Sequence, residues 1–545
     1  MSGHDRPAEL RAAVAGTLLP GFTGTALPDW LAQRLRDGLG GVCLFGVNIE
    51  SPSQLAALTA SILDANPDAV LAIDEEGGDV TRLHYDKGAP FPGNAVLGRI
   101  DDEVRTESVA RRVGVELRAA GCTLTFAPDA DINSDPRNPV IGVRSFGDDA
   151  GLVARHTAAW TRGLQSTGVA VSAKHFPGHG DTAHDSHLAL PVVDRSLEQL
   201  RERELVPFAA AVAAGARTVM TSHILLPRID PGNPATFSRG ILQGILREEL
   251  GFDGVIVSDA LDMVGASGEI GMPEAAVRAL AAGCELLCLG LDNTPEQLRR
   301  IEDHVLDAIG QGRLDASTVQ DAAAHVRSLA RELAAQRQSI PIGEYSDGDA
   351  SHVLGAGPAG NDFDAVALSD AFETNDAARA WIASPPRDVV VVRIDTVASI
   401  AIGAVPWGPF AAASAADGPW SPGRVVGFAE GMPLSALAID PSTAVIVVGR
   451  DIHRHAFVCE AIDLLRAGGR AVLVVEMGWP SPDRSYADLA TFGASRLIGE
   501  TLLAVLGSAE GPPGAQSTTA QPTTAQATTA QPTTAQPTTA QGEAR

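Results

Sequence analysis

The sequence predicts a parallel (β/α)8 barrel of the TIM type, followed by a smaller α/β sandwich domain and a disordered repeat tail. The 545-residue chain has 45% hydrophobic but only 4% aromatic residues, a composition that suits layered α/β packing. Short apolar runs alternate with amphipathic segments through the first half of the chain. Charged residues gather directly after those runs, where such a barrel builds its active site.

Eight apolar runs are the predicted barrel strands, each nearly continuous as expected for strands buried on both faces. In chain order they are residues 14–19, 41–46, 69–73, 123–127, 169–173, 217–222, 253–258 and 285–290. The predicted helices are residues 52–65, 102–119, 151–165, 195–214 and 273–282, with an extra closing helix at 317–337. These elements place the barrel, the catalytic domain, in residues 1–338.

The rest of the chain predicts three further parts. Residues 339–364 are rich in Gly, Pro, Ser and Asp and predict a linker. Residues 365–507 predict the smaller α/β domain, with strands at 387–394, 443–449 and 471–477 and helices at 456–469 and 494–507. Residues 508–545 contain a TTAQP-type repeat without bulky apolar side chains. That repeat cannot offset the entropy of folding, so we expect a disordered tail.

Charge and cysteine content narrow the class of partner. The net charge of −26 repels phosphate backbones and anionic lipid, so nucleic-acid and membrane partners are not expected. The first residues lack a signal-peptide pattern and the scattered cysteines fit a reducing compartment, which predicts a cytoplasmic location. Cys284 and Cys288 are expected to be buried small hydrophobic residues rather than metal ligands. Both a monomer and a weak homodimer fit the sequence.

Acids, bases and cations follow five of the predicted strands. Because the carboxyl ends of barrel strands open on one face, these side chains are expected to share one pocket. A helix-capping role explains one such residue more readily than five together. The residues are Asp74-Glu75-Glu76, Asp129 with Asp131, Lys174-His175, His223 and Asp259.

The stretch KHFPGHGDTAHDSH, residues 174–187, holds four of the thirteen histidines. It lies in a connection of roughly twenty residues, against a usual two to six for such loops. His175 and His179 have a spacing found in metal sites, but Pro177 and Gly178 oppose the helical turn that this spacing needs. No metal ligand set is therefore expected.

An acid–base pair is the alternative use of that stretch. Asp185 and His187 are two residues apart and point the same way in an extended loop. Asp185 can then orient His187, which can serve as acid and then as base near neutral pH. A turn-stabilising Asp185 beside a surface His187 fits the spacing equally well.

The stretch VIVSDALDM, residues 255–263, supplies a candidate nucleophile. Asp259 follows a predicted buried strand directly, so its carboxylate is placed with little freedom and can attack an electrophilic sugar carbon. A helix N-cap is the alternative role for Asp259. Asp262, one turn further on, is the weaker candidate.

Five motifs taken together resemble glycoside hydrolase family 3, and within it the bacterial β-N-acetylhexosaminidase branch. They are GGVCLFGVNI (40–49), DEEGGDVTR (74–82), NPVIGVRSFG (138–147), KHFPGHGDTAHDSH and VIVSDALDM. The resemblance implies a retaining mechanism with Asp259 as nucleophile, His187 as acid/base and Asp185 as the partner of His187. Many relatives take the acid/base from a glutamate of the second domain, whereas the DSH loop implies one from the barrel.

The same matching implies the residues that bind substrate. Four are expected to hydrogen-bond sugar hydroxyls in the first subsite, namely Asp74, Arg144, Lys174 and His175. Further candidates are Asp131, Arg82, His179 and Met263. Glu75 and Asp129 depart from the family pattern and leave the exact substrate preference open. His184 is expected to be a solvated loop residue, and no metal or organic cofactor is implied.

The implied activity is exo-acting hydrolysis of terminal β-linked N-acetylglucosamine, a small carbohydrate substrate drawn from cell-wall muropeptide fragments during peptidoglycan recycling. Phosphorolysis of β-N-acetylglucosaminides or β-glucosides and a β-glucosidase of the same family are alternatives. A metal-dependent barrel hydrolase and a non-catalytic sugar-binding protein are alternatives from other classes. The hydrolase hypothesis requires the Asp185–His187 pair to lie opposite Asp259 across the scissile bond.

Overall fold

The computed structural model describes residues 6–182, 190–340 and 365–507, apart from residues 398, 413–418, 422 and 438. The predictions for His184, Asp185 and His187 fall outside these residues. So do nearly all of the predicted linker and the predicted repeat tail.

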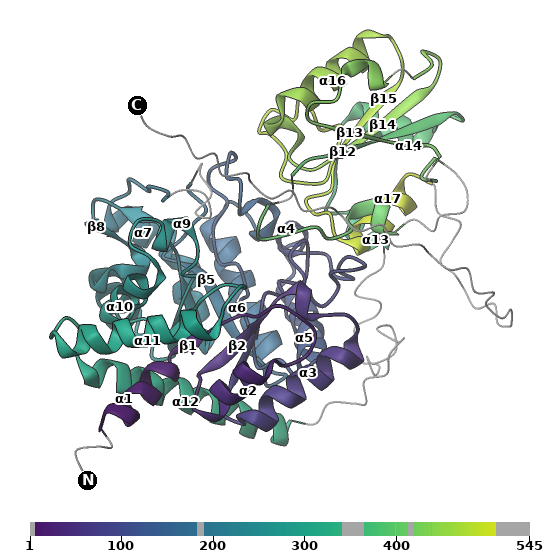
Figure 1. Ribbon diagram of the computed structural model, residues 1–545. Helices are drawn as coiled ribbons and strands as arrows, with labels where there is room; N and C mark the ends of the chain where they lie inside the picture. The colour runs from purple at the N-terminus through teal and green to yellow at the C-terminus, as the bar shows by residue number, and fades with distance from the viewer. Residues whose placement is uncertain are drawn as a thin grey trace, which may run out of the picture. The chain divides into compact units, whose positions relative to one another are not determined.

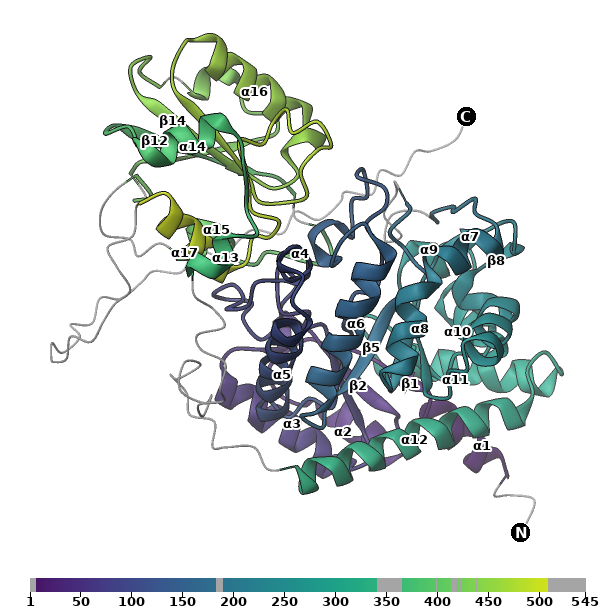
Figure 2. The same cartoon turned by 180° about the vertical axis from the view of Figure 1, so that it is seen from behind.

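The first sheet is a nearly closed barrel of eight parallel strands with helices around its outside (Figures 1 and 2). Its strand order is β1-β10-β9-β6-β5-β4-β3-β2. The strands are β1 (Leu18–Leu19), β2 (Gly41–Leu44), β3 (Val70–Ile73), β4 (Leu124–Thr125), β5 (Ala170–Phe176), β6 (Thr218–Thr221), β9 (Val255–Ser258) and β10 (Leu286–Cys288). The amide of Cys43 donates to the carbonyl of Pro20 at 3.0 Å, which joins β2 to the chain just after β1. The predicted barrel is confirmed.

The barrel helices are α1 (Arg6–Ala15), α2 (Asp29–Arg36), α3 (Pro52–Ala65), α4 (Asn94–Ile100), α5 (Glu103–Ala119), α6 (Ala150–Gln165), α7 (Leu197–Glu202), α8 (Leu205–Ala213), α9 (Val264–Ser267), α10 (Met272–Ala282), α11 (Pro295–Gly310) and α12 (Ala316–Ser339). Short elements complete it: the π-helix η4 (Gly240–Glu249), the 3-10 turns η1 (Gly46–Asn48), η2 (Gly142–Arg144) and η3 (Ala235–Phe237), and the hairpin β7 (Leu225–Leu226) with β8 (Asp230–Pro234). Several helices begin at capping side chains: Ser51, Asp102 and Asp149 accept hydrogen bonds from amides of the first turn.

Helix α12 covers the amino-terminal end of the barrel, as Figure 2 shows. Its buried side chains Leu329 and Leu333 belong to the same apolar cluster as inward-facing strand residues such as Val70 and Val255. This is the predicted closing helix. Because the barrel interior is filled by side chains and α12 packs against one end, a site for substrate is left at the carboxyl ends of the strands.

Two predicted elements differ from the observed ones. The first predicted strand, residues 14–19, is a strand only at Leu18–Leu19, and Val14 and Ala15 form the end of helix α1. Both parts are buried, so apolarity alone does not separate the helix end from the strand. The predicted helix 195–214 is broken into α7 and α8, and Pro207 lies in the first turn of α8, where a missing amide is tolerated.

The second sheet has six strands in the order β11-β16-β15-β14-β12-β13. They are β11 (Glu373–Thr374), β12 (Val389–Asp395), β13 (Val425–Ala429), β14 (Ala444–Gly449), β15 (Val472–Glu476) and β16 (Leu489–Ala490), parallel except for β11. Its helical elements are α13 (Ala365–Ser369), α14 (Asp376–Ala383), α15 (Gly408–Ala412), η5 (Leu434–Leu437), η6 (Ile452–Arg454), α16 (Ala456–Ala467) and α17 (Arg496–Val505). Strands β12, β14 and β15 were predicted, and edge strand β13 was not.

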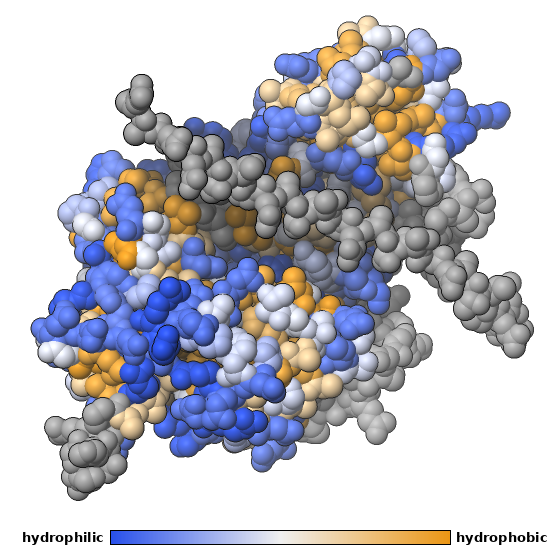
Figure 3. Space-filling model, in the orientation of Figure 1, coloured by the Kyte–Doolittle hydropathy of each residue, from blue (hydrophilic) through white to orange (hydrophobic). Residues whose placement is uncertain are grey.

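On the barrel surface that Figure 3 shows, hydrophilic residues predominate around helices α2, α11 and α12, with smaller apolar patches between them. None of the described helices is long and apolar enough to cross a membrane. Cys284 and Cys288 are buried free thiols, as predicted.

Candidate active site

Charged side chains from neighbouring strand ends meet at the carboxyl face of the barrel. Asp74 and Glu76 follow β3, Asp129 follows β4, and Lys174 lies near the end of β5. Asp129 forms a parallel bridge with Lys174, which continues the pairing of β4 with β5 beyond the regular strands. Strand topology therefore brings these residues together, as the sequence predicted.

Lys174 joins two carboxylates. Its Nζ lies 2.9 Å from Asp74 Oδ1 and 2.8 Å from Glu76 Oε1, and its side chain is only 3% exposed. Burial lowers the pKa of Lys174, but the charges of Asp74 and Glu76 outweigh burial and raise it. Lys174 is therefore a fixed, charged hydrogen-bond donor at neutral pH.

Arg144, presented by turn η2, forms a bidentate pair with Glu76. Its Nε lies 3.0 Å from Glu76 Oε2 and one terminal nitrogen lies 2.7 Å from Glu76 Oε1. Its other terminal nitrogen donates to the carbonyl of Val140 at 3.0 Å. Burial raises the pKa of Glu76, but Arg144 and Lys174 outweigh burial and hold it far below its ordinary value. Glu76 thus links the two cations expected to bind sugar.

Asp74 is the more open acid of this group, with 24% of its side chain exposed. Its second oxygen lies 3.8 Å from Arg82. Burial raises the pKa of Asp74, but Lys174 and Arg82 outweigh it, so the pKa stays below the ordinary value. An ionised acceptor beside a charged donor suits a hydroxyl group, which both donates and accepts.

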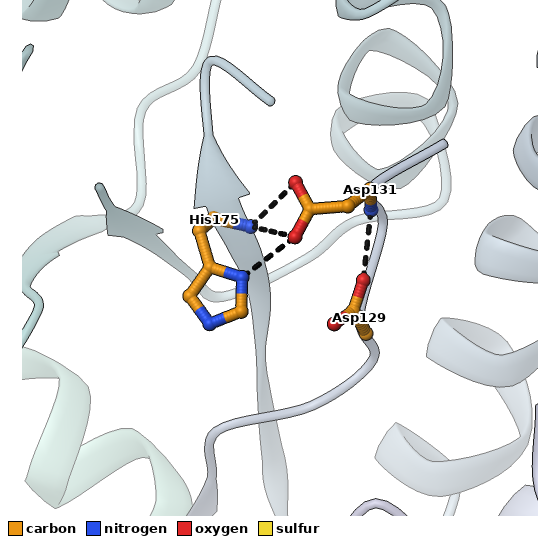
Figure 4. Close-up of side chains that lie close together, drawn as sticks. All are labelled: Asp129, Asp131 and His175. Carbon is orange, nitrogen blue, oxygen red and sulfur yellow. Dashed lines mark hydrogen bonds and ion pairs between the residues drawn. The ribbon is translucent and has the colours of Figure 1, made fainter. Parts of the chain in front are cut away.

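Asp131 organises the start of the histidine-rich stretch, as Figure 4 shows. It accepts from His175 Nδ1 at 2.6 Å, from the His175 amide at 3.3 Å and from the His179 amide at 2.6 Å. Burial raises the pKa of Asp131, but His175 and His179 outweigh it and lower the pKa. The bond to Nδ1 fixes the ring of His175, so that Nε2 is the nitrogen left to face a ligand.

Asp129 lies behind Asp131 and is fully buried. Its Oδ1 accepts from the Asp131 amide at 3.0 Å, and its Oδ2 lies 3.6 Å from Arg144. Burial and the charge of Asp131 raise the pKa of Asp129 well above its ordinary value. Asp129 therefore gives up its proton less readily than an ordinary aspartate.

Asp129, Asp131 and His175 form the one acid–histidine group of the described residues whose ligand atoms lie within 4.8 Å of one another. A metal ion bound through His175 Nδ1 would break the 2.6 Å bond between that atom and Asp131. It would also compete with the backbone amides that already bind Asp131. The hydrogen bonds of this group favour a role in holding His175 and the following turn over a role as a metal centre. The absence of a metal remains a prediction.

His179 is buried in the turn that follows β5. Its Nδ1 lies 3.0 Å from Thr182 Oγ1, and its carbonyl accepts from Asn138 at 2.9 Å. Burial and the neighbouring His175 lower the pKa of His179 to about 4. His179 is therefore neutral at pH 7, and it supports the turn through its hydrogen bonds and not through a charge.

Asp259 directly follows β9 and is partly exposed. Its Oδ1 accepts from the Ala260 amide at 2.8 Å, and its own amide donates to Thr221 at 3.3 Å. Helix α9 begins at Val264 and its N-cap residue is the buried Met263. The alternative of a helix N-cap at Asp259 is therefore wrong, and the carboxylate belongs to the strand end.

Two further predicted strand-end residues support turns. Glu75 accepts from the Thr81 hydroxyl and from the amides of Arg82 and Leu83 at 2.8 to 2.9 Å, so it holds that turn from within. His223 is buried, and its Nε2 donates to the carbonyl of Ala260 at 3.0 Å, which braces the turn after Asp259.

The structure thus brings together Asp74, Arg144, Lys174, His175 and Asp131, with Arg82 at its edge. Glu76 also belongs to this group through its contacts with Arg144 and Lys174, and sequence reasoning did not single it out. The available signal was its spacing, since Asp74 and Glu76 are two apart and both meet Lys174 while Glu75 turns away.

The chain matches known proteins over this region. The model of the "Glycosyl hydrolase family 3 N terminal domain" matches residues 25–329. "Beta-hexosaminidase A" of Pseudoalteromonas piscicida is 33% identical over 355 residues, which is 60% of this chain and 59% of that protein. "Beta-hexosaminidase" of Pseudomonas aeruginosa is 41% identical over 276 residues, 50% of this chain and 81% of that protein.

A solved structure extends the likeness to both sheets. The glycoside hydrolase family 3 β-N-acetylglucosaminidase from Paenibacillus sp. str. FPU-7 has a TM-score of 0.77 and 30% identity. The alignment covers 91% of this chain and 96% of that one. The architecture described above is therefore shared with a solved protein.

Proposed function

The chain belongs to glycosyl hydrolase family 3, and from that premise we propose that it is a retaining, exo-acting β-N-acetylglucosaminidase. The observation that carries the proposal is the buried network in which Lys174 joins Asp74 and Glu76, at the barrel face where Asp259 follows β9. A pocket of fixed donors and acceptors beside a strand-end carboxylate suits a polyhydroxylated substrate and a nucleophile.

The proposed reaction has two displacements. A carboxylate oxygen of Asp259 bonds to the anomeric carbon as the glycosidic bond breaks, and the imidazolium of His187 gives its proton to the leaving oxygen. Neutral His187 then takes a proton from water, whose oxygen attacks the same carbon and releases Asp259. Two inversions retain the β configuration. Asp185 is proposed to keep the proton on His187.

The first subsite is proposed to be the buried network itself. Asp74 and the charged nitrogens of Lys174 and Arg144 would bind the sugar hydroxyls, with His175 Nε2 as a further partner. Arg82 and Met263 are proposed to line the edge of this subsite. Asp131 and His179 would act by holding the turn that carries His175.

We also propose the setting of the reaction. The β-hexosaminidase relatives support N-acetylhexosaminides as substrates, and cell-wall muropeptide fragments in peptidoglycan recycling are the proposed source. Free cysteines support the cytoplasm as the compartment. The proposed parts are a catalytic barrel at 1–338, a linker at 339–364, an α/β domain at 365–507 and a tail at 508–545. The proposed assembly is a monomer or weak homodimer.

The test is release of 4-nitrophenol from 4-nitrophenyl N-acetyl-β-glucosaminide. We expect Asp259→Ala to lower kcat about a thousand-fold or more, because the covalent step is lost. Azide should restore part of the turnover of this variant by attacking in the vacated space, giving the glycosyl azide of inverted configuration. The neighbouring Asp262→Ala is the matched control and should keep its rate.

A normal rate in Asp259→Ala would refute the assignment. The same assay in phosphate buffer checks the phosphorylase alternative, since phosphorolysis yields the sugar 1-phosphate in place of free N-acetylglucosamine. A matching panel with the β-glucoside checks the glucosidase alternative.

A further inference from the structure

An ion-paired acid lies just before the segment that holds Asp185 and His187 in the sequence. Asp181 Oδ2 accepts from Arg195 Nε at 2.6 Å and from a terminal nitrogen of Arg203 at 2.9 Å. The Asp181 side chain is 15% exposed, whereas both arginines are at least a third exposed. A carboxylate shielded by two guanidinium groups is a stronger contact than a single surface pair.

The pairing continues into the protein through Glu204. Arg203 Nε lies 2.5 Å from Glu204 Oε1, and Glu204 is almost fully buried. Gly178 packs directly on that side chain, since a Cβ on Gly178 would lie 2.8 Å from Glu204 Cβ and Cγ. The Asp181 network is therefore anchored beneath the turn that follows β5.

The two flanks of residues 183–189 are each held by their own contacts. Before the segment, Asn138 Nδ2 donates to the carbonyls of His179 and Gly180 at 2.9 and 3.1 Å. After it, the Leu225 amide donates to the carbonyl of Pro191 at 2.8 Å, and the Val193 amide donates to the carbonyl of Leu225 at 2.9 Å. The Arg195–Asp181 pair then joins one flank to the other.

We propose that Asp181 is a positioning residue for proton donation. By binding Arg195 and Arg203, it fixes the distance between the residues that precede and the residues that follow segment 183–189. His187, the proposed acid/base residue, belongs to that segment in the sequence. The inference rests on the proposed function, because it assigns the proton donor to His187. In this proposal Asp181 acts through Arg195 and Arg203 and not on the substrate. Effective proton transfer needs the donor to be held within about 0.5 Å of the productive geometry. Loss of the Arg195–Asp181 pair is therefore expected to slow proton donation.

The leaving group separates this role from a merely structural one. A phenolate leaves slowly unless its oxygen receives a proton as the bond breaks, whereas 2,4-dinitrophenolate leaves without one. Attack by Asp259 is common to both substrates. A misplaced proton donor therefore slows the phenyl glycoside and spares the dinitrophenyl glycoside, while general damage to the barrel slows both.

The experiment compares Asp181→Asn with the wild type on phenyl and 2,4-dinitrophenyl N-acetyl-β-glucosaminide. The asparagine keeps the shape of the side chain and removes its charge. We expect kcat/KM for the phenyl glycoside to fall about 10- to 100-fold, less than the roughly 10²–10⁴-fold attributed to general acid catalysis, because the proton donor is displaced and not removed. The dinitrophenyl glycoside should lose less than about three-fold, which makes the dependence on leaving-group pKa steeper.

Two companion variants complete the design. Arg195→Gln breaks the tie from the opposite flank, at a more exposed residue, and should steepen the same dependence. Glu249→Gln is the control, because it removes the two-bond pair between Arg201 on helix α7 and Glu249 at the end of η4, at 2.7 and 2.8 Å, where the carboxylate is 32% exposed against 15% for Asp181. It should leave the leaving-group dependence unchanged.

Equal losses on both substrates in Asp181→Asn and Arg195→Gln would overturn the inference, as would no loss in either variant. Failure of the proposed function gives a different result, since the wild type would then turn over neither substrate. If Asp181→Asn does not fold, the comparison in Arg195→Gln decides the question alone.

Discussion

Glu76 is the residue on which the charge balance of the site depends. It accepts from Lys174 and twice from Arg144 while its side chain is 3% exposed. Removing one partner from a buried ion network leaves the other charges without compensation, which is more damaging than the loss of a surface pair. The network therefore supports the fold as well as the proposed sugar subsite.

We expect Glu76→Gln to lower the free energy of unfolding by about 3–5 kcal/mol, because Arg144 and Lys174 stay buried with one carboxylate fewer. Urea unfolding followed by circular dichroism measures the change. Glu107→Gln, which removes the exposed pair with Arg162, is the control and should change it by less than about 1 kcal/mol. Equal effects in the two variants would contradict a special role for Glu76.

At the residue scale, the sequence predicted where the charged site residues lie in the fold better than it predicted which partners they bind. Asp74, Lys174 and Asp259 could be placed because each lies at the end of a recognisable apolar run. Residues 74–76 are three acids in a row. Only the folded structure shows that Glu75 hydrogen-bonds Thr81 while Glu76 pairs with Arg144. The pairing of Asp131 with two distant amides depends on a turn whose path no local pattern specifies.

At the scale of elements, the barrel strands were predictable because they are buried on both faces and so have almost no polar residues. Strand β13 was not, since it lies at a sheet edge and is only partly buried. The π-helix η4 was also missed, because its hydrogen-bond pattern leaves no signature in a simple apolar period.

Helix α12 is an element whose contribution is separable from catalysis. Leu333 is 1% exposed and packs in the cluster that fills the amino-terminal end of the barrel. We expect Leu333→Ala to lower the free energy of unfolding by about 2–5 kcal/mol through loss of packing. The kcat/KM of the folded enzyme should stay within about two-fold, since the proposed chemistry takes place at the other end of the strands.

The measurement is urea unfolding together with the nitrophenyl assay below the unfolding transition. The control is Leu464→Ala on helix α16, the same substitution at a side chain that is 51% exposed. It should change stability far less. A large loss of kcat/KM in folded Leu333→Ala would show that the two ends of the barrel are coupled.

At the scale of the whole molecule, the buried acids predict how stability depends on pH. Asp74, Glu76 and Asp131 have pKa values below their ordinary range in the folded protein. In the unfolded chain these groups bind protons near pH 4. The unfolded state therefore takes up more protons as the pH falls, so stability present above about pH 5 is lost below it.

We expect the urea midpoint of Glu76→Gln to fall less between pH 6 and pH 4 than that of the wild type, because one of the three acids is gone. Other buried acids act in the opposite sense. Burial raises the pKa of Glu75, Asp79, Asp129, Glu204 and Glu476, and the stability that this gives is fully present below their unfolded pKa and is lost as the pH rises toward the folded value. The same groups are present in both proteins, so the difference between the two midpoints reports on Glu76. A fall in Glu76→Gln that equals or exceeds that of the wild type would contradict the lowered pKa of Glu76.

Side chains fill the barrel interior, and helix α12 packs against its amino-terminal end (Figure 2). The proposed sugar subsite is therefore approached from the carboxyl ends of the strands. Under the proposed mechanism the leaving group departs on that same side before a water molecule attacks the glycosyl–enzyme. A leaving group that dissociates slowly would then limit the second displacement, and its dissociation rate would affect turnover as much as the chemical steps.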